Sequence, residues 1–290
     1  MNASLHGFPT PTVSTDWLSE HLGTPDLKVV DASLYLPTAG RDAHAEFVAA
    51  HIPGAVFGDI DRLSDEHSAL PHTLLAPQVF AERIGALGIG SDDAVVVYDA
   101  SGQNFSAPRL WWMLRTYGHE RVSVLDGGLR RWTMDGHPVE SGDPTTEPAV
   151  FHARLEQARV RDLDAVRERL GDTSVQVVDA RSPGRFEATE PEPRAGIRGG
   201  HIPGSRNLHY ARLVRDDGTL RPIAELRELV AAAGIDVTRP VVASCGSGVT
   251  ACAVLLALDT IGMSDNAVFD GSWTEWGGRT DVPVETGPAR

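Results

Sequence analysis

The sequence is poor in cysteine, in basic residues and in long hydrophobic runs, and each shortage excludes a class of protein. Only Cys245 and Cys252 occur among its 290 residues, too few for a disulfide scaffold or a cysteine-rich zinc module. Lys and Arg number 26 against 40 Asp and Glu, so the formal net charge is −14. Because an acidic surface repels phosphate backbones and anionic lipids, we expect no nucleic-acid or membrane partner.

No segment has the composition of a membrane span or an export signal. The longest strongly apolar run, residues 251–258, is far shorter than the ~20 residues that cross a bilayer. The first residues lack the basic start and apolar centre of a signal peptide. We therefore predict a cytoplasmic protein, and a hydrophobic content of 41% is that of an ordinary packed chain.

The chain contains the same unit twice. The tetrapeptide HIPG at 51–54 recurs at 201–204, and VVDA at 29–32 recurs at 177–180. LDGG at 125–128 similarly corresponds to FDGS at 269–272. The order of the segments is kept and their spacing is nearly constant, so a repeat this long indicates two duplicated domains rather than a solenoid.

Short Val-rich runs alternate with segments of helical period in both copies. The expected strands are 28–32, 94–98, 122–125, 175–179, 240–244 and 267–269, and the expected helices are 77–87, 107–117, 223–233 and 249–261. This alternation predicts an α/β fold in which each copy is an open, mostly parallel sheet flanked by helices.

Turn-rich segments divide the chain. We predict an N-terminal domain at 1–140, a linker at 141–158 and a C-terminal domain at 159–290. Residues 1–14 are expected to be a loosely held lead-in, with Ser14 capping a helix that extends to Leu22.

The loop after the expected strand at 240–244 contains a candidate nucleophile. Glycines in a strand-to-helix loop let backbone N–H groups converge on Cys245, beside the partial positive charge of the helix start. Such a cradle favours the thiolate, the reactive form of cysteine. The alternative is a small buried apolar residue, which describes most free cysteines and is our prediction for Cys252. Asp99 has the matching place in the first copy, which favours chemistry in the second copy alone.

The duplicated unit, its two HIPG segments and the loop CGSGVT at 245–250 resemble the tandem-domain rhodanese family, in its 3-mercaptopyruvate sulfurtransferase branch. The resemblance extends over nearly the whole chain and implies two rhodanese-like domains, of which the first is non-catalytic. It implies a sulfurtransferase that moves sulfane sulfur from 3-mercaptopyruvate through a persulfide on Cys245 and releases pyruvate. Thiosulfate-using rhodaneses typically carry basic residues directly after the cysteine, where this chain has Gly246 and Ser247.

The resemblance also implies which residues bind the donor. Arg185 and Arg194 would hold its carboxylate and carbonyl oxygens, a role that suits the planar fork of a guanidinium. A short cradle sized for one sulfur atom completes the binding site. Its residues after the cysteine are Gly246, Gly248, Val249 and Thr250. The other arginines of this region are expected to be solvated or in structural ion pairs; they are Arg181, Arg198, Arg206 and Arg212.

Proton transfer is assigned by the same resemblance to a triad of Asp61, His72 and Ser247. Asp61 would orient the imidazole of His72, which would pass a proton through Ser247 to the substrate. The alternative for His72 is an ordinary surface-loop histidine. We expect His51 and His201 to hydrogen-bond backbone near their HIPG turns.

Three other functions stay open beside this one. Thiosulfate could be the donor, or the chain could be a non-catalytic rhodanese module that docks partners. A phosphatase with a related fold is disfavoured, because it needs an arginine six residues after the cysteine, where this chain has Ala251. We expect no dissociable cofactor and no metal. The expected partners are a small anionic sulfur donor and an acceptor, either cyanide or a thiol such as thioredoxin or a small thiol.

Overall fold

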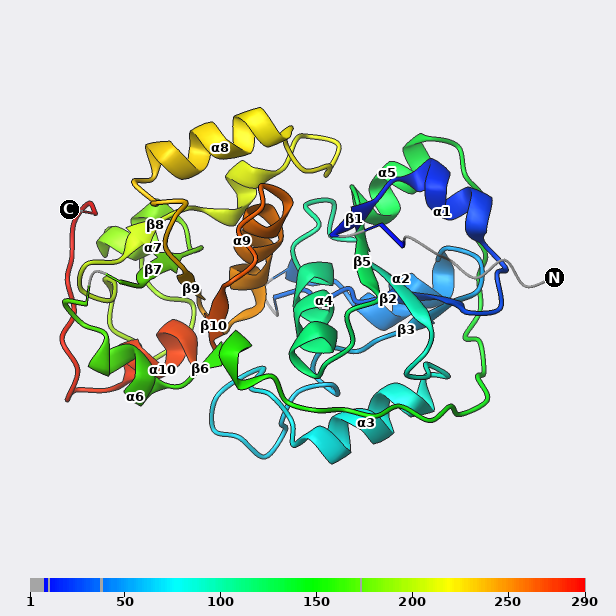
Figure 1. Cartoon of the computed structure of the whole chain (residues 1–290), viewed down its shortest axis with the longest axis horizontal. Helices are drawn as coiled ribbons and strands as arrows, with labels where there is room; N and C mark the ends of the chain where they lie inside the picture. Colours follow the sequence, from blue (N-terminus) through cyan, green and yellow to red (C-terminus); the bar gives the residue numbers. More distant parts are fainter. Residues whose placement is uncertain (1–7, 10, 37–38, 173, 290) are drawn as a thin grey trace. The chain divides into compact units, whose positions relative to one another are not determined.

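The computed structural model describes residues 8–9, 11–36, 39–172 and 174–289, which form two compact units (Figure 1). The first unit contains the described residues up to Ser64, then Leu74–Glu156 and Val214–Leu220. The second contains Asp65–Thr73, Gln157–Leu213 and the described residues from Arg221 onward. Each unit therefore includes one short segment from the half of the chain that builds the other.

The first unit is built on a parallel five-stranded sheet. Its strands are β1 (Thr12–Val13), β2 (Leu27–Asp31), β3 (Ala55–Phe57), β4 (Ala94–Tyr98) and β5 (Val122–Leu125), in the order β1-β5-β4-β2-β3. The central strand β4 is buried at every position. A strand covered on both faces is apolar throughout, which explains its sequence AVVVY.

Five helices accompany this sheet. They are α1 (Thr15–His21), α2 (Ala43–Ala49), α3 (Pro77–Ala86), α4 (Ala107–Thr116) and α5 (Gly128–Met134). Leu18, Phe47 and Trp132, from α1, α2 and α5, share one core cluster with alternate residues of the strands. Helix α4 packs on β4 and β5.

The second unit has the same architecture. Its strands are β6 (Val160–Arg161), β7 (Gln176–Asp179), β8 (Arg206–Asn207), β9 (Val241–Ser244) and β10 (Ala267–Phe269), in the parallel order β6-β10-β9-β7-β8. Its helices are α6 (Leu163–Glu168), α7 (Pro183–Glu187), α8 (Ile223–Ala232), α9 (Val249–Thr260) and α10 (Ser272–Gly278), with 3₁₀ turns at Gln157–Arg159 and Tyr210–Leu213. The duplication predicted from sequence is thus present as two sheets of identical strand order.

Helix α9 is rich in apolar residues, and it is buried along most of its length. A helix buried on all sides needs no polar face, which explains its lack of amphipathic period. None of the helices in the described residues combines the length and apolarity that crossing a bilayer requires.

The predicted α/β class is confirmed. Every predicted strand and helix is present, and the ends differ from the predicted ones by one residue at most. The Ser14 side chain caps α1 by accepting the Trp17 N–H at 3.1 Å. Both HIPG histidines bond backbone as expected, through Nδ1 of His51 to the Phe47 carbonyl and Nδ1 of His201 to that of Phe186.

The expectation of a loosely held lead-in at 1–14 is wrong for two residues. Thr12 and Val13 form the edge strand β1, which pairs with β5. Two residues are too short a segment for periodicity to reveal. Residues 1–7 and 10 lie outside the described residues.

The segment predicted to be a linker packs on the first unit as far as Glu156. Ala149 donates its N–H to the Gly85 carbonyl at 2.9 Å, and Arg154 donates to that of Tyr117 at 3.0 Å. Backbone hydrogen bonds of this kind hold a segment to a surface whatever its side chains are, so the sequence gives no sign of them.

Candidate active site

Cys245 directly follows β9, the central strand of the second sheet, and a short loop leads to α9, which begins with Val249 and Thr250. The residue is 2% exposed. Gly248 donates its N–H to the Cys245 Sγ at 3.1 Å. Its φ of +82° is a left-handed conformation that glycine adopts without strain. The loop therefore wraps the sulfur in backbone at the carboxyl end of the sheet, where α/β proteins place their ligands.

The start of α10 binds the carbonyl groups of this loop. Trp273 donates its N–H to the Cys245 carbonyl at 2.9 Å. Thr274 donates both its N–H, at 3.0 Å, and its hydroxyl, at 2.6 Å, to the Gly246 carbonyl. Because C=O and N–H are antiparallel in a trans peptide, the next N–H groups of the loop point away from α10. Of the N–H groups in this loop, that of Gly248 contacts Cys245 Sγ.

Ser272 also supports the loop, and sequence reasoning missed it together with Thr274. Its hydroxyl oxygen accepts the Cys245 N–H at 3.2 Å and donates to the Phe269 carbonyl at 2.9 Å. Ser272 has a φ of +48°, uncommon for a residue other than glycine. The one signal was the recurrent FDGS segment, which marked the repeat but did not reveal this contact.

Two of the predicted donor-binding residues lie beside the residue that follows Cys245. A methyl group placed on Gly246 would be 3.1 Å from Nη2 of Arg185 and 3.7 Å from Nη1 of Arg194. Glycine at this position leaves room for both guanidinium groups. Two guanidinium groups are thus available beside the cysteine loop of a protein whose formal net charge is −14.

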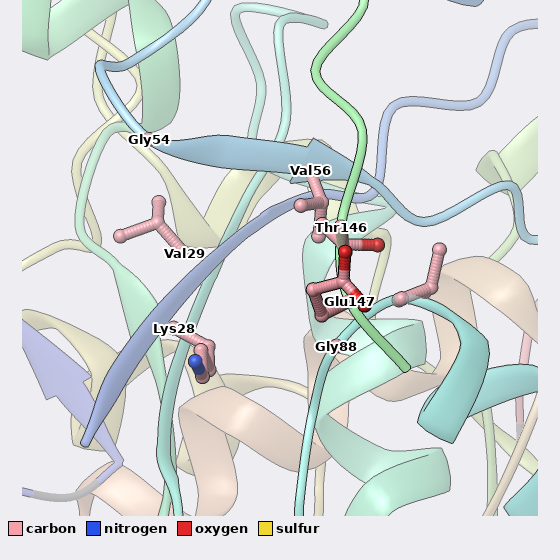
Figure 2. Close-up of a pocket in the computed structure, with 8 residues that line it drawn as sticks. Lys28, Val29, Gly54, Val56, Gly88, Thr146 and Glu147 are labelled. Carbon is pink, nitrogen blue, oxygen red and sulfur yellow. The ribbon is translucent and has the colours of Figure 1, made fainter. Parts of the chain in front are cut away.

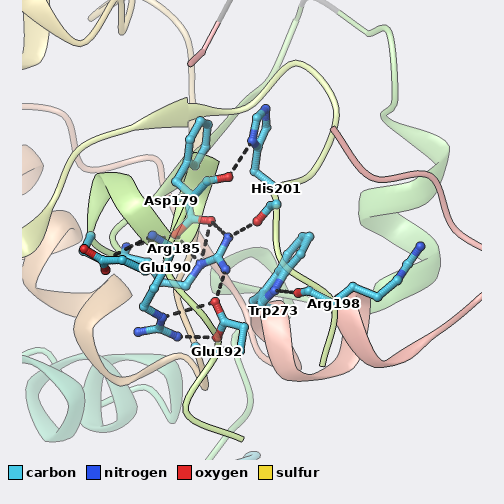
Figure 3. A network of polar contacts seen from close by, with 12 residues as sticks. Asp179, Arg185, Glu190, Glu192, Arg198, His201 and Trp273 are labelled. Atoms are coloured by element: carbon cyan, nitrogen blue, oxygen red, sulfur yellow. Dashed lines mark hydrogen bonds and ion pairs between the residues drawn. The ribbon is translucent and has the colours of Figure 1, made fainter. Parts of the chain in front are cut away.

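Arg185 of α7 belongs to an ion-pair network that extends from the end of β7 to the loop after α7 (Figure 3). Its Nη2 donates to Glu192 Oε2 at 2.6 Å, and Glu192 Oε1 accepts from Arg181 Nη1 at 2.7 Å. The Arg181 side chain is completely buried and paired with Asp179. Of the two interpretations given above for Arg181, the solvated charge is therefore wrong and the structural ion pair is confirmed.

Arg198 also has a structural role. Its guanidinium donates to the carbonyls of Trp276, Gly277 and Val282, each at 3.2 Å. These contacts tie the end of α10 to the chain that follows it. The helix that supports the Cys245 loop is thus fixed at both ends.

His72 and Ser247, 175 residues apart in sequence, are in contact. Nδ1 of His72 lies 2.8 Å from Oγ of Ser247. His72 belongs to the segment Asp65–Thr73, which packs with the second unit. Its φ of +61° is a strained conformation, of a kind that clusters at functional sites. Ser247 is 7% exposed. These contacts do not fit an ordinary surface-loop histidine.

Asp61, the third residue of the predicted triad, belongs to the first unit. Its N–H donates to Oδ1 of Asp59 at 2.9 Å. Its pairing with His72 stays a prediction.

A second histidine, His209, lies near Arg185 and Arg212. Burial lowers the pKa of His209, and the charges of Arg212 and Arg185 lower it further, against the opposing charge of Glu190. The lowered pKa favours the neutral form of His209.

The matching position of the first copy lacks a nucleophile. The Asp99 carboxylate accepts the N–H groups of Ser101, Ser106 and Ala107 at 2.9, 2.9 and 3.0 Å. Asp99 is 1% exposed, so its own carboxylate fills the turn that holds a sulfur in the second copy. This arrangement is structural.

A pocket of about 240 Å³ opens elsewhere in the first unit (Figure 2). Lys28 of β2 and Val56 of β3 line it together with Thr146 and Glu147. None of the residues predicted for the site borders this pocket.

Both halves of the chain match the family model of the rhodanese-like domain, at residues 14–135 and 162–279. The human 3-mercaptopyruvate sulfurtransferase is 46% identical over 269 residues, which cover 91% of each chain. The mitochondrial thiosulfate/3-mercaptopyruvate sulfurtransferase 1 of Arabidopsis thaliana is 43% identical in an alignment of 297 positions, which covers 95% of this chain and 78% of the relative. The crystal structure of SseA from Escherichia coli, described as a 3-mercaptopyruvate sulfotransferase, matches with a TM-score of 0.84 and 40% identity over 91% of this chain and 99% of SseA.

Proposed function

The chain belongs to the rhodanese-like domain family and is a sulfurtransferase, and we propose that its sulfur donor is 3-mercaptopyruvate. The observation that carries the proposal is the placement of two guanidinium groups, Arg185 and Arg194, beside Gly246. The donor has a carboxylate next to a ketone, and a planar guanidinium fork binds such oxygens in pairs. Two arginines from outside the cysteine loop supply these donors, while the loop itself carries no basic residue.

In the proposed reaction, the Cys245 thiolate attacks the sulfur of the donor. A sulfur–sulfur bond forms as the donor's carbon–sulfur bond breaks, and the electron pair leaves with the carbon as the enolate of pyruvate. Protonation of the enolate releases pyruvate and leaves a persulfide on Cys245. The backbone N–H of Gly248, which points at Sγ, would stabilise the attacking thiolate.

His72 and Ser247 are proposed to move the proton. The contact of 2.8 Å between Nδ1 and Oγ is short enough for direct transfer. The histidine would exchange a proton with the reacting group through the serine hydroxyl, and Asp61 would orient the ring.

A second nucleophile would then remove the outer sulfur. We propose a thiol, either thioredoxin or a small molecule, or cyanide. The cytoplasmic location stays a prediction, and the Arabidopsis relative carries the word mitochondrial in its name.

Steady-state kinetics with both donors test the proposal. We expect a higher kcat/KM with 3-mercaptopyruvate than with thiosulfate, and pyruvate formed in proportion to transferred sulfur. Cys245→Ser should abolish turnover. Cys252→Ser is the matched control, because Cys252 is fully buried within α9 and bonds the Gly248 carbonyl, which a serine can also do. Pyruvate formation by Cys245→Ser would overturn the assignment of the nucleophile.

Thiosulfate is the second candidate donor, favoured by the name of the Arabidopsis relative, which carries both donors. A higher kcat/KM with thiosulfate in the same assay would make it the preferred donor. A chain inactive with either donor would support a docking module instead.

A further inference from the structure

Glu192 has an unusual place for a carboxylate in a Pro-rich surface loop. Its side chain is only 4% exposed and lies between two arginines. Oε2 accepts from Nη2 of Arg185 at 2.6 Å, and Oε1 accepts from Nε of Arg185 at 3.2 Å. The pair is therefore side-on and bidentate, as the dashed contacts of Figure 3 show.

Arg181 holds Glu192 from the other side. Its Nη1 donates to Glu192 Oε1 at 2.7 Å. Its Nη2 donates to Asp179 at 2.5 Å and to the Gly200 carbonyl at 2.7 Å, and its Nε lies 3.0 Å from both Asp179 oxygens. A side chain with 0% exposure and this many partners has a single conformation. Glu192 thus connects Arg185 to a rigid part of the second unit.

The same arginine is in contact with the helix that supports the nucleophile loop. The Arg181 guanidinium stacks 4.3 Å from the ring centroid of Trp273. The backbone N–H of the same tryptophan donates to the Cys245 carbonyl. One set of side chains therefore contacts both the cysteine loop and the arginine beside it.

The first copy of the domain lacks this arrangement. Ser33 stands two residues after Asp31 at the end of β2, where the second copy has Arg181 after Asp179. The buried arginine is thus particular to the copy that carries Cys245. If the fold itself required a buried arginine at this position, both copies would have one.

We infer that Glu192, held by Arg181, is a positioning residue that orients Arg185 toward the carboxylate of the sulfur donor. The inference rests on the proposed function. With Nε and one Nη2 hydrogen directed at Glu192, the Nη1–Nη2 edge is the part of Arg185 left to bind a second carboxylate. Arg185 is 23% exposed, and its Nη2 faces Gly246. Ordering this flexible side chain in advance reduces the entropy lost when the donor binds.

The sign of one kinetic effect separates positioning from simple electrostatics. Removing a negative charge near the arginines would by itself strengthen the binding of an anionic donor and lower KM. If Glu192 orients Arg185, its loss has the opposite effect and raises KM. In Glu192→Gln the amide keeps the shape of the side chain, but its NH₂ cannot accept from Arg185.

The experiment compares Glu192→Gln with Glu190→Gln, which removes the same charge from the same loop. Glu190 is exposed and accepts from the Ser182 hydroxyl at 2.9 Å. We expect Glu192→Gln to raise KM for 3-mercaptopyruvate about tenfold with kcat changed less than about threefold, the size of one well-placed charged contact. Glu190→Gln should leave KM unchanged or lower. An unchanged or lowered KM in Glu192→Gln overturns the inference.

A double-mutant cycle shows whether Glu192 acts through Arg185. In an Arg185→Ala background, Glu192→Gln should change KM by less than about twofold. A full tenfold effect in that background means a general structural role and also overturns the inference. If Glu192→Gln does not fold, Glu192→Asp replaces it, with the charge kept and the reach one carbon shorter, and KM must still rise. Absence of 3-mercaptopyruvate turnover in the unmodified chain would instead refute the proposed function, so the two failures are distinguishable.

Discussion

Two aspartates at matching positions of the two copies have different partners. Asp179 pairs with the buried Arg181, whereas Asp31 has the N–H of Ser33 at 2.9 Å and no arginine at the corresponding position. Burial raises the pKa of Asp31 to about 6, in spite of its hydrogen bonds to Ser33 and Tyr98. At the end of β7 the aspartate is thus stabilised by an ion pair. At the end of β2 the ionised form of the matching aspartate is destabilised by burial.

Asp31→Asn should therefore change the pH dependence of stability. The folded-state pKa of about 6 is above the ordinary value of 3.8, so the folded chain binds more protons than the unfolded chain between these values. The free energy of unfolding contributed by this group accordingly falls as pH rises from about 4 to about 6, by on the order of 2 kcal/mol. Asparagine is neutral at every pH and keeps the oxygen that accepts from Ser33. Relative to the unmodified protein, the variant should gain stability between pH 4.5 and pH 7.5.

Urea unfolding at these two pH values measures the effect. Asp179→Asn is the matched control, since it leaves the buried Arg181 without its main partner and should destabilise the protein at pH 7.5. An Asp31→Asn difference that is the same at both pH values would contradict the account.

Some residues of the site could be predicted from sequence and others could not. Cys245 was predictable because its chemistry is local: a strand, a glycine-containing loop and a helix start are all visible in one segment. Ser272, Thr274 and Glu192 were not, because their roles depend on contacts with side chains and loops elsewhere in the second unit. A buried carboxylate such as Glu192 has the same sequence signature as a solvated one.

Among the helices and strands, the longer apolar segments were predictable, whereas the two-residue strands and the shortest helix were not. Strand β4 and helix α9 are continuous runs of buried residues, so composition alone indicates them. Strands β1, β6 and β8 have two residues each, and helix α7 has five. Such short elements are stabilised by pairing with neighbours rather than by their own propensity.

The junction between β9 and α9 depends on one backbone conformation. Gly248 is left-handed at the N-terminus of α9, and an L side chain there costs about 1–2 kcal/mol. We expect Gly248→Ala to destabilise the protein by about 1 kcal/mol. Sulfur transfer should fall by more than about tenfold, because the N–H that faces Cys245 Sγ is displaced.

Gly262, after the C-terminus of α9, is the matched control for this prediction. Its φ is +95°, and an added Cβ would meet no atom within 4 Å. Gly262→Ala therefore introduces backbone strain of the same kind but leaves the contact between the Gly248 N–H and Cys245 Sγ in place. Thermal unfolding and kcat/KM of both variants provide the test. Equal activity of two equally destabilised variants would contradict a role for the Gly248 N–H.

In the molecule as a whole, the two duplicated domains differ at the end of their central strands, where one has Cys245 and the other Asp99. The second sheet carries Cys245, the proposed nucleophile, and the corresponding turn of the first is filled by Asp99. The second unit nevertheless includes a segment from the first half of the chain, Asp65–Thr73, which contributes His72 to the proposed proton transfer. The strongly acidic composition is compatible with the proposed anionic donor, because Arg185 and Arg194 beside Gly246 would bind it locally.

The role proposed for Cys245 is to carry the transferred sulfur. Its most direct test is mass spectrometry of the protein treated with 3-mercaptopyruvate in the absence of an acceptor. We predict a gain of one sulfur atom on the peptide that contains Cys245, reversed by a thiol, present in Cys252→Ser and absent from Cys245→Ser. Folded protein that releases pyruvate without this gain, or that gains sulfur on Cys252 instead, would contradict the account.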